Sequence, residues 1–390
     1  MAKYSNEQID AIIEEAYAQY TGNKEPGEID LTQFTDEGTN ADYVVARDRF
    51  TNALLTASTK RMYTDRAFGD SFKDEFYVDA REFGGAMTIV SIEAPEVREN
   101  PAWHDFVSGT SQVGQYTVYI PVVEEKVYAK STSWALPFTV TDEQWDTAFA
   151  SKEDLRDFVA QIFIAVENKI KEHIKNEAAL NRANFIAEKM QYAATPGAKG
   201  VHAVNLVKAY LDEKGITGGM TVAEFDQNFE AKKWAIARMS LDYDYIQDQS
   251  GLYNVGNKVK FIPKDRIRFQ MLAHFAKKLE FDVLAPTFHE SILELPGFST
   301  VSAWQNASDE SFNTRSSISV KTKSGTFAKS GIVALIVDQY AIMHTIRKTR
   351  LASQRFDIEA LTQYSYQYRD SFMNNLGLPG IVYYLADVTV

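Results

Sequence analysis

The chain of 390 residues is long enough for two or three domains, and with 45% apolar and 24% charged residues it can bury a core. It has no cysteine, which excludes disulfides, thiolate metal sites and cysteine nucleophiles. Its formal net charge of −12 disfavours a dedicated nucleic-acid-binding protein, because such proteins normally present a basic surface.

Targeting signals are missing from the sequence pattern. Residues 1–10 are polar and contain no apolar signal-peptide core, so we do not expect secretion. No stretch reaches about 18 consecutive apolar residues, the length that a membrane-spanning helix needs, so we expect no membrane association.

A short amphipathic helix is predicted at the N-terminus, and a polar linker follows over residues 22–40. About four turns of helix are marginal in water, so the apolar stripe needs a partner, either its own body or a neighbouring subunit. Residues 1–40 carry nine carboxylates against two lysines, which concentrates negative charge in this segment. The pattern fits an extended arm or a helix docked on its own domain. The stripe consists of Ile9, Ile12, Ile13, Ala16, Tyr17 and Tyr20.

A long two-stranded excursion is predicted over residues 86–137. Residues 41–66 before it have a helical pattern, and residues 86–95 read as its first strand. Further strand patterns cover residues 126–133 and 138–140. Because a hairpin without a third strand is marginal alone, we expect something outside the chain to stabilise it. Apolar side chains alternate at Tyr116, Val118, Ile120 and Val122.

The most informative segment is residues 151–195, which contain neither glycine nor proline. Apolar residues recur every three or four positions and predict a helix over 151–192, on the order of 60 Å long. A helix of that length must lie along an elongated body or act as a rigid strut, since its drifting pattern argues against a coiled coil. The apolar positions are Leu155, Val159, Ile162, Val166, Ile170, Ile174 and Ala178.

The second half of the chain alternates between helical and strand patterns, and its final third is rich in strands. The predicted elements are a helix at 221–249, a strand at 261–269, a helix at 270–281, a loop-rich polar stretch at 291–324 and strands at 332–337, 342–356 and 361–372.

No catalytic constellation is present in the sequence. A phosphate-binding loop is absent, and the six histidines are scattered singly without metal-ligand spacing. Asp242, Asp244 and Asp248 resemble the start of a calcium loop, but Ile246 occupies the next ligand position and the required glycine is missing. We interpret these aspartates as a solvated helix face, and expect no enzyme activity, cofactor or metal site.

The order of the parts resembles the Hong Kong 97-like α+β fold of tailed-bacteriophage major capsid proteins, with small podovirus capsid proteins closest in look. The junction Phe138-Thr-Val-Thr-Asp-Glu-Gln-Trp145 is similar to the family's passage from hairpin to helix. The runs Ile332–Ile342 and Gly380–Leu385 resemble its C-terminal end. The resemblance implies an N-terminal arm at 1–44, a peripheral domain at 45–85, 138–200 and 340–375 with the spine helix 151–192, an E-loop hairpin at 86–137, and an axial domain at 201–339 and 376–390.

The resemblance implies a structural subunit, not an enzyme, that assembles itself as pentamers and hexamers into an icosahedral shell around the phage genome. It also implies a separate scaffolding protein and a portal as partners, packaged double-stranded DNA bound without sequence specificity, and location in the virion after assembly in the host cytoplasm. An encapsulin-like compartment in the same fold and a soluble α/β enzyme are the alternatives. The expected subunit-interface residues are Ile9, Ile12, Ile13, Tyr17, Tyr116, Val118, Ile120 and Val122.

Two basic clusters belong to predicted strands. One holds Lys258, Lys260, Lys264, Arg266 and Arg268, and the other holds Arg347, Lys348, Arg350 and Arg355. Each is either a solvated strand face or a contact with packaged DNA or acidic neighbours. Tight phosphate binding would trap packed DNA, so acidic protein partners are favoured over DNA.

Overall fold

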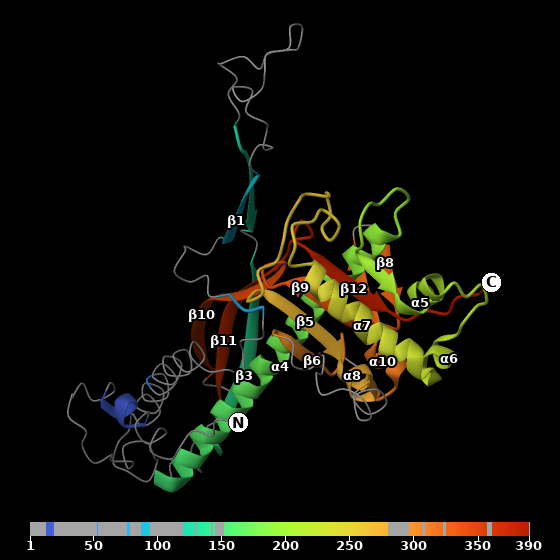
Figure 1. Ribbon diagram of the computed structural model, residues 1–390. Helices are drawn as coiled ribbons and strands as arrows, with labels where there is room; N and C mark the ends of the chain where they lie inside the picture. The colour runs from blue at the N-terminus through green and yellow to red at the C-terminus, as the bar shows by residue number, and fades with distance from the viewer. Residues whose placement is uncertain are drawn as a thin grey trace, which may run out of the picture.

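The computed structural model describes residues 13–18, 53, 76–78, 87–93, 120–128, 131–141, 143–144, 152–279, 296–305, 309–322, 325–356 and 361–389. These residues form a protein of mixed helix and sheet with three parts. A five-stranded sheet with its helices makes one body, a long helix lies against a three-stranded sheet, and a two-stranded hairpin projects away from both (Figure 1). No helix in these ranges is long and apolar enough to cross a membrane.

The five-stranded sheet is the centre of the largest core. Its order is β4-β12-β9-β5-β6, with β4 parallel to β12, β5 parallel to β6, and the central pairs antiparallel. All seven residues of β9 are buried, as its continuous apolar run predicts for a strand covered on both faces. The strands are β4 (Ala203–Asn205), β5 (Ile267–Leu272), β6 (Phe298–Val301), β9 (Ile332–Asp338) and β12 (Gly380–Tyr384).

Short helices surround this sheet, and their ends follow local capping chemistry. Thr221 and Glu224 form a reciprocal capping box at the start of α6, and Asn228 caps α7 by accepting from the backbone N–H of Ala231 at 3.2 Å. The helical pattern predicted over 221–249 corresponds to two helices, which Asn228 separates. The helices are α5 (Leu206–Lys214), α6 (Val222–Gln227), α7 (Phe229–Tyr245), α8 (Ala273–Leu279) and α10 (Phe312–Arg315).

Two expectations for this region need correction. The strand expected at 261–269 begins only at Ile267, because Pro263 follows an isolated bridge between Ser250 and Lys260 and interrupts the pairing. The stretch 291–324 is not only loop, since it contains β6, α10 and the strand β7 (Ile318–Thr322). That strand pairs with β8 (Gly325–Lys329).

The long helix α4 (Lys152–Ala193) runs without interruption and confirms the helix predicted over 151–192. It lies on a sheet of order β10-β11-β3, formed by β10 (Ile342–Phe356), β11 (Leu361–Asn374) and β3 (Thr132–Thr141). Ile170 and Ile174 of the helix pack on Tyr366 and Tyr368 of β11. The first half of α4 therefore packs on the C-terminal strands.

The second half of α4 belongs to the other body. Phe185 and Ile186 are fully buried in the core of the five-stranded sheet. Between the two bodies, the Asn181 side chain donates to the backbone oxygens of Met343 and Met373, at 3.3 and 3.5 Å. One helix thus joins the two sheets.

The pairing of β10 with β11 contains one irregularity. Ile346 lies opposite Asp370, but Lys348 lies opposite Arg369, so Arg347 is an additional residue between them. This is a β-bulge, which shifts the register of everything that follows in β10.

The hairpin consists of β1 (Met87–Glu93) and β2 (Val122–Tyr128) in antiparallel register. A strand at 86–95 and a hairpin across residues 86–137 were expected, and β1 and β2 confirm the pairing. Strand β2 ends at Tyr128 and β3 begins at Thr132, so the continuous strand expected over 126–133 is two strands. Of the N-terminal helix, residues 13–18 are helical; the remainder, and most of the helix expected at 41–66, lies outside the described residues.

Candidate subunit-interaction surfaces

One face of the hairpin is exposed and carries three valines, with Glu125 among them. Residues opposite each other in an antiparallel pair share a face, and Val90 pairs with Glu125, between the Ile92–Val123 and Thr88–Val127 pairs. Three valines therefore lie on the same side of the ribbon. Val90, Val123 and Val127 are 56%, 59% and 57% exposed.

The opposite face of β2 makes polar contacts with the body. Glu124 forms an ion pair with Lys258, and that hydrogen bond holds the pKa of the Glu124 carboxyl below its usual value. The Lys126 ammonium donates to the Asn375 side-chain oxygen at 2.9 Å. The Tyr128 hydroxyl donates to the backbone oxygen of Asn374 at 3.4 Å. The hairpin is thus attached through one polar face and presents valines on the other.

Among the described residues, the valine face of the hairpin has no cover. Three exposed valines on one side of a narrow ribbon are costly in water, and two strands alone are marginal. An apolar face of this kind is typical of a surface that another protein buries.

The expected interface residues are distributed unevenly. Ile120 is 77% exposed, but it precedes β2 and does not belong to the strand. Val122 is the first residue of β2, opposite Glu93. Ile13 is buried within its own chain, and Tyr17 is half-buried. Ile9, Ile12, Tyr116 and Val118 lie outside the described residues.

Sequence reasoning missed the valines at 90, 123 and 127. It followed even-numbered positions, whereas even-numbered Glu124 and Lys126 in β2 face the body. The available signal was that Val123 and Val127 lie on one face of β2, with Glu125 between them on the same face, and that charge obscured the apolar pattern.

The end of β11 and the residues that follow it join the hairpin to both bodies. Asn374 donates to the backbone oxygen of Asn181 in α4 at 3.1 Å, next to the contact between Asn375 and Lys126. The backbone oxygen of Leu376 accepts from the N–H of Val255 at 3.0 Å. The root of the hairpin is therefore tied to α4 and to the loop after α7.

Two buried titratable groups lie at α4 and the sheet beneath it. Burial lowers the pKa of Lys189 to about 7; its ammonium donates to the backbone oxygens of Tyr253 at 3.0 Å and Leu378 at 3.4 Å. Burial also raises the pKa of Asp370 on β11 to about 6, against the smaller opposing effect of the Trp134 indole N–H nearby. Both groups are enclosed by packing and are not placed to meet a substrate; Lys189 joins α4 to the segments of Tyr253 and Leu378.

The expectation that Asp242, Asp244 and Asp248 solvate a helix face is wrong for Asp242. This side chain is 1% exposed, and its Oδ2 accepts from Arg238 at 3.1 Å and from the Tyr383 hydroxyl at 2.9 Å. It links α7 to β12 inside the core.

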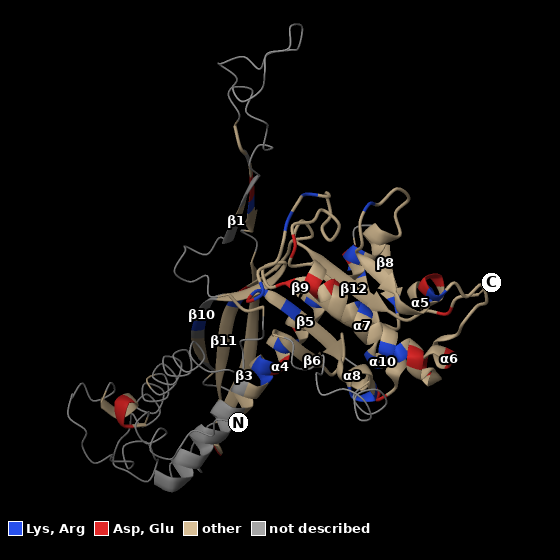
Figure 2. Ribbon diagram, in the orientation of Figure 1, with Lys and Arg blue, Asp and Glu red and all other residues tan. Residues whose placement is uncertain are grey.

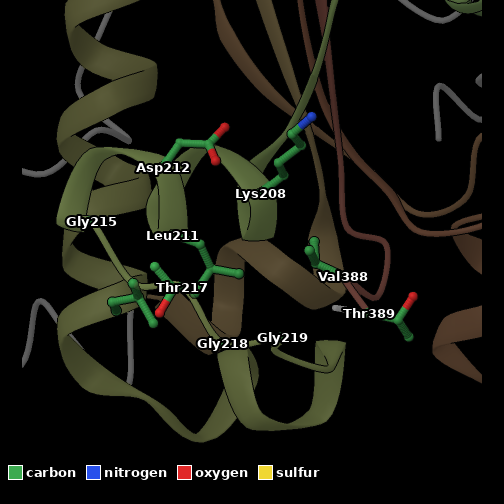
Figure 3. Close-up of a pocket in the computed structure, with 10 residues that line it drawn as sticks. Lys208, Leu211, Asp212, Gly215, Thr217, Gly218, Gly219, Val388 and Thr389 are labelled. Carbon is green, nitrogen blue, oxygen red and sulfur yellow. The ribbon is translucent and has the colours of Figure 1, made fainter.

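A hollow of about 440 Å³ lies between α5, the segment after it and the C-terminal residues (Figure 3). Lys208 and Asp212 are the charged side chains that line it, beside Leu211, Ile216 and the backbone of a glycine-containing loop. Within the part of the chain that the structure describes, no group of three potential metal ligands occurs. The hollow resembles a docking surface more than a catalytic site.

The chain was compared with protein-family models, with curated proteins and with solved structures. A family model for the Phi29-like phage major capsid protein matches residues 9–384. A chain in the structure of the head fibre and inner core protein gp22 of native bacteriophage P68 is 11% identical, covers 79% of this chain and 83% of its own length, and has a TM-score of 0.51, which indicates a shared fold. A chain in the capsid structure of Staphylococcus phage Andhra is 10% identical, with coverage of 78% and 81% and a TM-score of 0.48. No curated protein matches the sequence.

Proposed function

Because the chain belongs to the family of Phi29-like phage major capsid proteins, we propose that it forms pentamers and hexamers of an icosahedral shell around the phage genome. The family is a structural one, and the chain is a phage major capsid protein. The work of such a subunit is to hold shape and to bind its neighbours. The encapsulin-like compartment considered from the sequence is not favoured by this family match.

The proposal includes a Hong Kong 97-like division of the chain. In it, α4 is the spine helix, the three-stranded sheet beneath it belongs to the peripheral domain, and the five-stranded sheet is the axial domain. The hairpin β1–β2 is the base of the E-loop at 86–137, and residues 1–44 are the arm. The contacts of α4 support this division, since the first half of the helix packs on the three-stranded sheet and the second half packs on the five-stranded sheet.

The observation that carries the proposal is the two-faced hairpin. Its polar face is fixed to its own subunit through Glu124 and Lys126, so its valine face points away from the body. A neighbouring subunit that covered Val90, Val123 and Val127 would remove this apolar surface from water. In a closed shell every subunit has such a neighbour.

The further partners follow from the same function. We propose a separate scaffolding protein during assembly, a portal at one vertex, and packaged double-stranded DNA inside without sequence-specific contacts. The net charge of −12 fits a container that does not hold its DNA tightly. The mature protein would then reside in the virion, after assembly in the host cytoplasm.

The test is electron microscopy of the purified protein, expressed alone and together with candidate scaffolding proteins from the same genome. We expect closed particles of uniform diameter. Nucleic-acid content of particles from infected cells separates the two shell functions, because a phage capsid carries the genome whereas a compartment carries protein cargo. Soluble monomers under every condition would contradict the proposal.

A further inference from the structure

The loop between α7 and β5 is rigidly held although it is exposed. The backbones of Ser250 and Lys260 exchange two hydrogen bonds of 3.1 Å. The Asn254 side chain accepts from the N–H of Lys258 at 3.0 Å and donates to its backbone oxygen at 2.6 Å. The loop is therefore shaped before it meets any partner, which lowers the entropy cost of binding.

This loop presents apolar side chains to solvent, flanked by cations. Leu252, Val259 and Phe261 are 50%, 66% and 51% exposed. Residues 249–268 contain five lysines and arginines and one carboxylate. Figure 2 shows Lys and Arg along the loop that rises beside β5 and β9. The surface formed by residues 249–268, here named the basic loop, thus combines exposed apolar side chains with cations. Of these cations, Lys258 is already paired with Glu124 and Arg268 with Gln339, while Lys264 and Arg266 are exposed.

The opposite end of α7 has the complementary character. Helices α5 and α6 present carboxylates, which Figure 2 shows in red. The exposed carboxylates are Asp212, Glu213, Glu224, Glu230 and Asp387, against Lys208 and Lys214. The hollow of about 440 Å³ lies in this surface, and Ile216 at its lining is 44% exposed. We name this surface the acidic edge.

The two surfaces cannot meet within one chain. Helix α7 has 17 residues, which corresponds to about 25 Å between its ends. Its N-terminal end adjoins α6 at the acidic edge, and its C-terminal end leads into the basic loop (Figure 1). Two different, complementary surfaces on opposite sides of one body are what a head-to-tail contact requires, and such a contact forms a ring when the rotation between subunits closes.

We propose that the basic loop of one subunit docks into the acidic edge of the next copy, with Val259 and Phe261 entering the hollow beside Ile216. The contact rests on the proposed shell function and specifies which surfaces join subunits within a ring. Burial of the exposed apolar side chains supplies affinity, while the opposite charges set the orientation. Lys264 and Arg266 of the basic cluster would thereby have an acidic protein partner and not DNA, whereas Lys258 is already paired with Glu124 of its own chain.

Because the chain has no cysteine, a pair of introduced cysteines tests the contact directly. The variant Ile216→Cys with Phe261→Cys should give a ladder of disulfide-linked oligomers from oxidised particles on a denaturing gel. Each single-cysteine variant is the matched control and should give dimers at most. Particles of the double variant without a ladder would overturn the contact and leave the shell function intact. Absence of particles from the unmodified protein would overturn both.

Charge reversal is the second test, with assembly measured by sedimentation. Lys264→Glu with Arg266→Glu, and separately Asp212→Lys with Glu213→Lys, should each lower particle yield at least tenfold. All four changes in one chain should restore the yield to within about twofold, because the attraction is rebuilt with reversed sign. Two reversals that do not compensate each other would contradict the proposal. Far-ultraviolet circular dichroism of the free subunits checks that each variant is folded.

Discussion

The two largest sheets of the described residues differ in how much of their surface the chain itself covers. The five-stranded sheet is covered by helices and buries every residue of β9, so it completes its own core. The three-stranded sheet is covered by α4 on one face, and β3 alternates between exposed and partly buried residues. The hairpin goes further and exposes valines. The five-stranded sheet buries its apolar residues within the chain, whereas the three-stranded sheet and the hairpin leave surface that a neighbouring subunit can bury.

This contrast predicts a gradient in the effect of substitutions on the free subunit. Changes in the five-stranded body should alter the free energy of unfolding most. Changes on the hairpin should hardly alter it and should act on assembly instead. The following experiments are ordered by their expected effect on unfolding.

Trp304→Ala should have the largest effect. The indole is fully buried in the main core and donates to the backbone oxygen of Ile332 at 2.8 Å. Its loss should lower the free energy of unfolding by about 3–5 kcal/mol, measured by guanidinium denaturation of unassembled subunits. Trp134→Ala in the three-stranded sheet is the control, and we expect less than half of that cost because Trp134 is only partly buried. Equal costs would abolish the contrast between the regions.

Lys189→Met should reveal the cost of a cation inside the five-stranded body. The lysine titrates near 10.5 when unfolded and at about 7 when folded, so between these values the unfolded chain binds the extra proton. The free energy of unfolding of the wild type should therefore rise with pH across this window, and the full cost applies below pH 7. The pH-dependent difference between wild type and variant should reach on the order of 2–4 kcal/mol. Parallel stability profiles from pH 6 to 10 would show that the ammonium is solvated.

Asp370→Asn probes the boundary between α4 and the three-stranded sheet. The carboxyl titrates near 3.8 when unfolded and at about 6 when folded, so the folded chain binds the extra proton between these values. The wild type should lose stability as pH rises from 3.8 through 6, and the variant should not. At pH 7 we expect the variant to be more stable by about 1–2 kcal/mol, allowing for solvent screening. Thermal unfolding at pH 4 and pH 7 measures the difference, and a wild type that gains stability over this interval would refute it.

Val123→Asp with Val127→Asp should have the smallest effect on unfolding, within about 0.5 kcal/mol, because both side chains already face water. Particle yield should nevertheless fall sharply, since the valine face would carry two unpaired charges into the contact. Val123→Thr with Val127→Thr keeps the shape and should assemble. Normal particles from the aspartate variant would mean that no subunit covers this face.

The elements that the sequence predicted well are those whose pattern is long. Helix α4 and strands β9, β10 and β11 each extend over enough residues for a period to show, and the predicted bounds of β10 coincide with the observed ones. The elements that were missed depend on distant partners. Strand β4 has three residues and exists because it pairs with β12, far along the chain.

The candidate surfaces were predictable only in kind. The sequence indicated a hairpin in need of a partner, but it could not say which side of the ribbon faces the body. That side is decided by Lys258 and Asn375, which are distant in sequence from Glu124 and Lys126. Similarly, Asp242 is buried because Tyr383 lies beside it, and no local pattern around position 242 contains that information.

The bulge at Arg347 has a consequence for how this sequence can change over generations. Beyond it, Arg350 lies opposite Gln367, with its side chain exposed. In an unbroken ladder Arg350 would fall opposite Tyr366, on the side that packs against α4. A codon lost between 347 and 349 could therefore be absorbed by removal of the bulge, while Arg350 and the residues after it keep their partners. In the regular part of β11 there is no bulge that could absorb a deletion. Loss of a codon there would turn the following side chains to the wrong face.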